Sequence, residues 1–249
     1  MSYDLYVCIP PLPPSDQDAW KLFESLRSER GEKPQVFKEL ITRLAARFPW
    51  ELPVDSDKHV WSISPLWDCI GTRVTGLCMI YPKVVEVVPF VIETAMDLGL
   101  DVFEPQLTWI FRHDGLKGLV LSAEDKPPLM APTLPQILEA VDSLKPIGGP
   151  GYLVLQDERD DYAQSAGGYG VFTAEWREYE GKSFRHWVAG NPGQPSTNDV
   201  LIEAYQRDIT VKENERLTAA QVKEILAAYA MREKRPSGFA WRDMTEMFR

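Results

Sequence analysis

The sequence predicts an α+β fold made of two small domains, each a mainly antiparallel sheet packed with helices. Apolar residues recur at helical spacing in some segments and alternate with polar residues in others. Four prolines in residues 123–136 separate two such sets of segments and interrupt regular structure. We therefore predict an N-terminal α+β domain at residues 1–125 and a C-terminal α+β domain at residues 126–249.

The first half alternates between strand and helix signals. Its opening strand has alternating apolar residues and stops at the proline run of residues 10–14. Ser15 is a candidate N-cap for the first helix, and Gly99 closes the last one. In chain order, we predict a strand at 3–9, helices at 15–29 and 35–48, strands at 60–67 and 72–81, a helix at 82–99 and a strand at 101–112.

The second half contains a long stretch with the pattern of a β-hairpin. Phe172, Ala174 and Trp176 share one face of a predicted strand, so residues 162–188 should form an antiparallel meander. Its turns are expected at Gly167–Gly168 and near Gly181. Around it, we predict helices at 134–144, 197–208 and 217–234 and a strand at 152–156.

The charge balance favours a basic protein as the partner. Lysine and arginine total 27 against 37 for aspartate and glutamate, a net charge of −10 that repels nucleic acids and anionic membranes. We therefore expect neither a nucleic-acid nor a membrane partner. Cys8, Cys69 and Cys78 lie in apolar runs, which is typical of free thiols in a reducing compartment. No secretory signal pattern precedes them, so a cytoplasmic location is expected.

No motif for catalysis, for a metal or for a cofactor is complete, so none of these is predicted. The glycines of residues 167–170 precede a strand and lack the spacing of a phosphate loop. His59, His113 and His186 are far apart in the sequence and have no partner at metal-ligand spacing. The carboxylates near the hairpin show no spacing that selects an acid and base pair; they are Asp157, Glu158, Asp160, Asp161, Glu175, Glu178 and Glu180.

Short motifs in both halves resemble a known type of bacterial protein. The first half contains "MSYDLYV" and "AMDLGLDVFEPQ", and residues 152–189 of the second half contain a Gln-x-x-Gly-Gly turn followed by an aromatic-Glu strand. These segments resemble immunity-type proteins of polymorphic-toxin and type VI secretion loci. The second match rests on Asp157, Gln164, Gly167, Gly168, Glu175 and Trp176.

The resemblance implies a binder that occludes a cognate toxin in the producing cell without chemistry of its own. The acidic hairpin and its aromatic residues then supply the expected partner contacts: Asp157, Glu158, Glu175, Trp176, Glu178, Glu180 and Trp187. Two alternatives stay open, a toxin-loading adaptor and an enzyme that uses an unrecognised carboxylate pair. The sequence names neither the toxin nor the oligomeric state.

Overall fold

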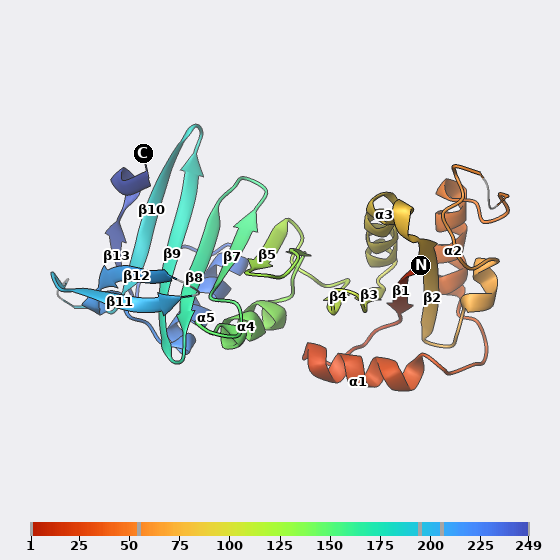
Figure 1. The fold of residues 1–249 in the computed structure, drawn as a ribbon, viewed down its shortest axis with the longest axis horizontal. Coiled ribbons are helices and arrows are strands. Elements are labelled where there is room, and N and C mark those ends of the chain that lie inside the picture. Colours follow the sequence, from red (N-terminus) through yellow and green to blue (C-terminus); the bar gives the residue numbers. More distant parts are fainter. Residues whose placement is uncertain (1, 54–55, 194–195, 205–206, 249) are drawn as a thin grey trace. The chain divides into compact units, whose positions relative to one another are not determined.

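The structure, a computed structural model, describes residues 2–53, 56–193, 196–204 and 207–248 (Figure 1). The chain divides into two compact units, unit 1 at Met1–Gly115 and unit 2 at Leu116–Arg249. Each unit contains an antiparallel sheet with helices packed on it, so the predicted α+β class is confirmed.

The boundary between the units falls before Leu116 and not after residue 125. Strand β5 (Leu119–Ala123) pairs with β7 (Tyr152–Asp157) and with β6 (Leu129–Met130), and both partners belong to unit 2. The segment 123–136 is therefore part of unit 2 and is not a linker. Its prolines interrupt regular structure only locally, while the residues on either side still pair with the sheet.

Unit 1 is a four-stranded sheet with strand order β2-β1-β3-β4 and helices on both sides. Its elements are β1 (Ser2–Cys8), α1 (Asp16–Leu26), α2 (Gln35–Arg47), η1 (Leu66–Cys69), β2 (Val74–Ile80), η2 (Tyr81–Lys83), α3 (Val84–Asp97), β3 (Asp101–Glu104) and β4 (Trp109–Phe111). The strand predicted at 60–67 is wrong. Trp61 forms a single bridge to Met79, and the chain then enters η1 after Pro65, which has no backbone N–H for a sheet.

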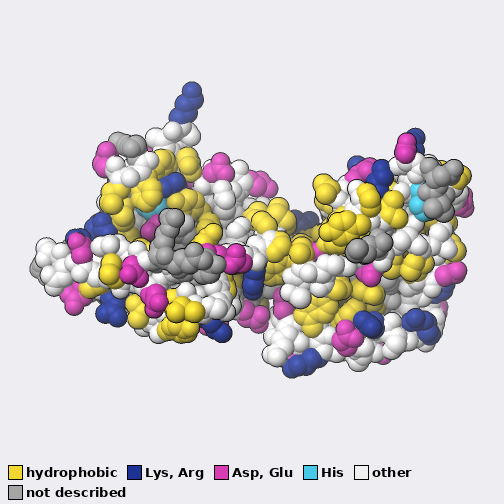
Figure 2. Space-filling model, in the orientation of Figure 1, with side chains coloured by type: hydrophobic (Ala, Val, Ile, Leu, Met, Phe, Trp, Pro, Cys, Tyr) yellow, Lys and Arg dark blue, Asp and Glu magenta, His cyan; other side chains and the backbone are white. Residues whose placement is uncertain are grey.

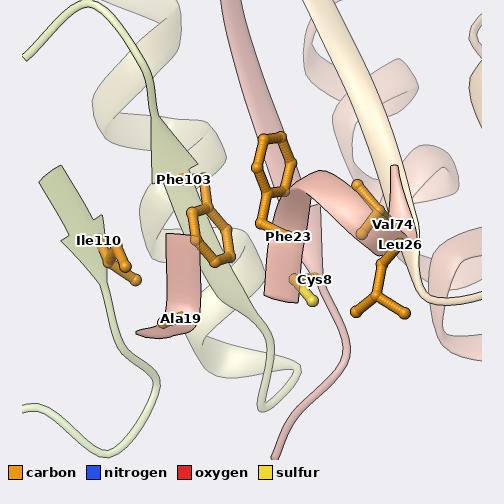
Figure 3. Close-up of a cluster of buried hydrophobic side chains, with 7 residues drawn as sticks. All are labelled: Cys8, Ala19, Phe23, Leu26, Val74, Phe103 and Ile110. Atoms are coloured by element: carbon orange, nitrogen blue, oxygen red, sulfur yellow. The ribbon is translucent and has the colours of Figure 1, made fainter. Parts of the chain in front are cut away.

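Helix α1 covers one face of this sheet through a cluster of seven buried side chains (Figure 3). Phe23 of α1 stacks on Phe103 of β3 with ring centroids 4.7 Å apart. Leu5 and Leu77 are paired across β1 and β2 and are fully buried. Because side chains alternate along a strand, these two lie on the opposite face, where α3 contacts β2 and β3.

Unit 2 contains a seven-stranded sheet with strand order β13-β10-β9-β8-β7-β5-β6 and a separate hairpin, β11-β12. Its further elements are α4 (Leu134–Ser143), β8 (Tyr162–Gly168), β9 (Val171–Glu180), β10 (Ser183–Gly190), β11 (Asp199–Ala204), β12 (Arg207–Lys212), η3 (Glu213–Glu215), α5 (Ala219–Ala230), β13 (Ala240–Asp243) and η4 (Thr245–Phe248). Thr133 and Thr218 begin α4 and α5 with capping boxes, as their spacing to a glutamine three positions later allows.

The predicted meander is confirmed in β8, β9 and β10, but its first turn lies later than expected. Gly168 pairs with Val171, so the turn consists of Tyr169 and Gly170, whose φ angles are both positive. Gly167 and Gly168 are instead required by close packing. A Cβ at Gly167 would lie 2.3 Å from the carbonyl oxygen of Val171, and one at Gly168 would lie 2.5 Å from Cδ of Pro146. The second turn is at Gly181, as predicted.

The helix predicted at 197–208 is wrong, because this segment contributes the hairpin β11-β12. Its described residues alternate, with Ile202 and Ala204 buried and Leu201 and Glu203 exposed. Ile202 pairs with Ile209 of the following β-branched strand, and that partner strand decides between the two patterns. Residues 205–206 lie outside the described residues.

The two faces of the unit 2 sheet are covered differently (Figure 1). Helix α5 contacts β8 and β9 on the face that carries Trp176, and Tyr229 of α5 packs against this tryptophan. On the other face, β11 contacts β8 and β9 and crosses only part of the sheet. The remaining part of that face lies near η4, where Phe248 packs on His186 of β10. Because α5 covers one face and β11 and η4 cover the other only in part, the hairpin β9-β10 has a buried side and a partly open side.

Candidate partner-binding groove

The two tryptophans predicted as partner contacts lie inside unit 2. Trp176 is 2% exposed and packs edge to face against Tyr229 and Trp241. Trp187 is 6% exposed, and the guanidinium of Arg235 lies 3.5 Å from the centre of its ring. Both side chains point to the face that α5 and the segment after it cover, so they stabilise the unit and are removed from the candidate surface.

Asp157 is also an internal residue. Its side chain is 3% exposed, and its carboxylate forms ion pairs with Arg159 and Arg232 at distances of 3.2 and 3.3 Å. Its Oδ1 accepts hydrogen bonds from the backbone N–H groups of Arg159 and Asp161. A buried carboxylate needs such partners, and here they hold the turn between β7 and β8. The neighbouring Glu158 is exposed.

Glu175 belongs to a polar network on the opposite face of the sheet. Its Oε2 accepts a hydrogen bond from Gln164 at 2.6 Å and lies 2.9 Å from Nε2 of His186. Arg177 donates through Nε to Nδ1 of His186 at 3.1 Å. Because Arg177 can only donate, Nδ1 must be the acceptor. Nε2 then carries the hydrogen and donates a hydrogen bond to Glu175. Both ring nitrogens of His186 are therefore occupied.

Aromatic rings surround the arginine of this network. The guanidinium of Arg177 lies 4.9 Å from the ring centre of Tyr162, 4.3 Å from that of Phe184 and 4.9 Å from that of Phe248. Such cation–π contacts hold a charged side chain within a mostly apolar layer. The network therefore fixes Phe184 and η4 in position beside the outer edge of β10.

The last two predicted acidic contacts, Glu178 and Glu180, lie on β9 next to β10. Glu178 is half-buried and accepts a hydrogen bond from Nε1 of Trp176 at 2.9 Å, so part of its carboxylate is used in a contact with the core. Glu180 is exposed at the end of β9 and lines an open groove with a volume of about 480 Å³. We call this the edge groove; its lining residues are Glu180, Ser183, Phe184, Arg185, Asp243, Met244, Thr245, Glu246 and Met247.

The edge groove lies where the neighbouring strand ends early. β9 pairs with β10 as far as Ser183, whereas β13 pairs only with Trp187–Gly190. At Asp243 the chain leaves the sheet and enters η4. In the described part of the chain, the outer side of Ser183–Arg185 therefore has no paired strand.

The groove has an acidic character with one internal ion pair. Arg185 and Asp243 are 3.0 Å apart, and both side chains are largely exposed. Hydrogen bonds from Thr245, together with Arg185, lower the pKa of Asp243 to about 2, so this carboxylate is charged at any physiological pH. Glu180, Asp243 and Glu246 thus supply three carboxylates, while Arg185 supplies the one basic side chain of the lining.

Apolar side chains accompany these charges. Met247 is 72% exposed and Phe248 is 46% exposed, both in η4 beside β10. Figure 2 shows hydrophobic side chains gathered on the face of unit 2 that carries β9, β10 and η4, with charged side chains among them. A surface that combines exposed methionine and aromatic groups with charges at the rim is typical of a protein-binding site.

Sequence reasoning found Glu180 but missed the other side of the groove. Asp243 and the residues of η4 are far from the hairpin in the sequence, and only the pairing of β13 with β10 brings them together. A usable signal was the segment from Phe239 to Phe248, which is apolar and aromatic but carries charges at intervals, as a short edge strand often does.

Within the described residues, no group of three or more His, Cys, Asp or Glu side chains could hold a metal ion. No helix in the described part of the chain is long and apolar enough to cross a membrane. In comparisons with known proteins, no protein-family model and no curated protein matches the chain.

Proposed function

We propose that this chain is a cytoplasmic, immunity-type protein that neutralises a co-encoded toxin by binding to it, without catalysis. The observation that supports this proposal is the edge groove, an acidic and partly apolar surface at an open sheet edge. The motif resemblance to immunity proteins of polymorphic-toxin and type VI secretion loci supports it independently.

Electrostatics favour a basic toxin as the partner. The chain has a net charge of −10, and the groove is lined by three carboxylates, one of which, Asp243, forms an ion pair with Arg185. Toxins that act on nucleic acids carry basic surfaces, because they must attract phosphate. Opposite charges on the two surfaces would speed the encounter and help to select the correct partner.

The polar network behind the groove is better suited to positioning than to proton transfer. His186 is completely buried, and both of its ring nitrogens already have partners in Glu175 and Arg177. A general base must reach a substrate proton with a free nitrogen or through one water molecule. This geometry therefore argues against His186 as a general base, whereas the alternative of a carboxylate enzyme is left to the activity test. The adaptor alternative differs in outcome, since an adaptor leaves the bound toxin active.

Reversing two charges of the groove should weaken toxin binding. We predict that Glu180→Lys with Glu246→Lys lowers the affinity by about tenfold at low ionic strength, and by less at high salt, because exposed charges are screened. Glu178 is left unchanged in this design because it accepts the hydrogen bond from Trp176 and does not line the groove. The measurement is the dissociation constant for the product of the neighbouring gene, determined at two salt concentrations.

A matched control separates the groove from the overall charge. Glu203→Lys with Glu224→Lys changes the net charge equally, at exposed positions on β11 and α5. The control should retain affinity and rescue cells that co-express the toxin, whereas the groove variant should rescue them poorly. Equal loss in both variants would show that the overall charge and not the groove determines binding. No association with either neighbouring gene product would count against the proposed function itself.

A further inference from the structure

We propose that the edge groove receives an extended, lysine- or arginine-containing segment of the partner protein, which adds to the sheet as a strand beside Ser183–Arg185 of β10. The inference rests on the proposed function only for the identity of the partner as a toxin. The mode of binding follows from the backbone geometry of β10, from the lining of the groove and from its charges.

The first step concerns the direction of backbone groups along β10. Met244 donates its N–H to the carbonyl oxygen of His186, and the N–H of His186 is bonded to Oγ1 of Thr245. The polar backbone groups of His186 therefore face the side of β13 and η4. Along a strand these directions repeat every second residue, so the N–H and C=O of Phe184 face the same side. Phe184 thus presents a donor and an acceptor at the floor of the groove.

The second step concerns the space beside this residue. The groove continues the line of β13, which pairs with β10 from Trp187 onward and ends at Asp243. η4 forms the far wall, so the groove occupies the position that the next strand of the sheet would take. Open sheet edges are the usual sites at which an extended peptide is added through main-chain hydrogen bonds.

The third step concerns the side chains of the added strand. Phe184, Met244 and Met247 provide apolar contacts, while Glu180, Asp243 and Glu246 provide carboxylates. Because successive side chains of a strand point to opposite faces, a segment that alternates basic and apolar residues can use both sets. Asp243 stays charged because its pKa is low, so its attraction for a lysine or arginine persists across the physiological pH range.

The direct test uses the full-length chain and a fluorescently labelled peptide of alternating lysine and valine. We expect saturable binding in fluorescence anisotropy. The same peptide with every backbone nitrogen methylated lacks backbone donors, and we expect its affinity to be at least about tenfold lower. A peptide with glutamate in place of lysine should not bind. Hydrogen exchange of the Phe184 amide should slow when the lysine peptide is present.

Variants of the chain locate the site. Glu180→Gln with Glu246→Gln should weaken peptide binding by about fivefold, the size expected for two exposed charge pairs. Glu203→Gln with Glu224→Gln should leave it unchanged. Equal binding of the N-methylated peptide, or unchanged exchange at Phe184, would overturn strand addition. Self-association of the chain that competes with the peptide would identify a second copy as the occupant and would also overturn the proposal.

The outcomes also separate this inference from the proposed function. If the toxin is neutralised and the groove variants bind it normally, strand addition at this edge is wrong while the immunity function stands. If the lysine peptide binds at Phe184 but no neighbouring gene product is toxic, the groove is a peptide site in a protein with a different role.

Discussion

Replacing Trp176 by alanine should lower the free energy of unfolding of unit 2 by about 3 to 5 kcal/mol, the usual cost of removing a buried large aromatic side chain. Trp176 is 2% exposed and packs against Tyr229 and Trp241, so the substitution would leave a cavity between the sheet and α5. The measurement is chemical denaturation of the full-length chain, followed by far-UV circular dichroism.

Two control variants make this result specific. Trp176→Phe keeps most of the ring contacts and should cost clearly less than alanine. Tyr169→Ala, at a side chain that is 68% exposed in the β8-β9 turn, should change the stability by less than about 0.5 kcal/mol. If Trp176→Ala kept full stability but lost toxin binding, this tryptophan would be an interface residue, as the sequence predicted, and its assignment to the core would be wrong.

Raising the pH from acidic to neutral should destabilise unit 1 through Glu104. This side chain is 1% exposed, and its Oε1 has no hydrogen-bond partner among the described residues. Burial raises the pKa of its carboxyl from 4.5 to about 7. The folded state therefore holds the proton more tightly than the unfolded state, so the stabilising contribution is complete below the unfolded pKa and is lost as the pH rises through about 7.

The size of this effect follows from the shift in pKa. A difference of about 2.5 pKa units between the folded and unfolded states corresponds to about 3 kcal/mol, at 1.36 kcal/mol for each unit. Glu104→Gln has no titrating group and should remove this loss. The measurement is hydrogen exchange of unit 1 peptides in both full-length proteins as a function of pH, corrected for intrinsic exchange rates. It reports the loss of unit 1 stability in each protein. Parallel pH profiles in the two proteins would contradict the assignment.

Local patterns in the sequence predicted the elements whose residues decide their own structure. The alternation of Phe172, Ala174 and Trp176 predicted β9 and the face it buries, and Thr218 with its glutamine partner marks the start of α5. The segment from Asp199 to Ala204 satisfied both helical and strand patterns. Its structure depends on pairing with β12, and the pattern of residues within the segment does not show whether such a partner strand is present.

The candidate site depended even more on distant residues. Glu180 is exposed at the end of a strand and was predicted from local acidity, whereas Asp243 reaches the groove only because β13 pairs with β10. Asp157 and Trp187 are residue types that often make surface contacts. In the fold, however, Arg232 pairs with Asp157 and Arg235 packs on Trp187, and both arginines come from the segment after α5. Charge and aromatic content identify the residue types of an interface, while burial is decided by long-range packing.

The most direct test of binding without catalysis is a titration of the toxin's activity with the purified chain. An immunity protein that occludes its toxin should reduce the activity in proportion to the amount added, complete the inhibition at one chain per toxin and leave the covalent mass of the toxin unchanged. Complete inactivation at far less than one chain per toxin, with a change in the toxin's mass, would show turnover and contradict the account. Full toxin activity within a stable complex would instead identify an adaptor and contradict it equally.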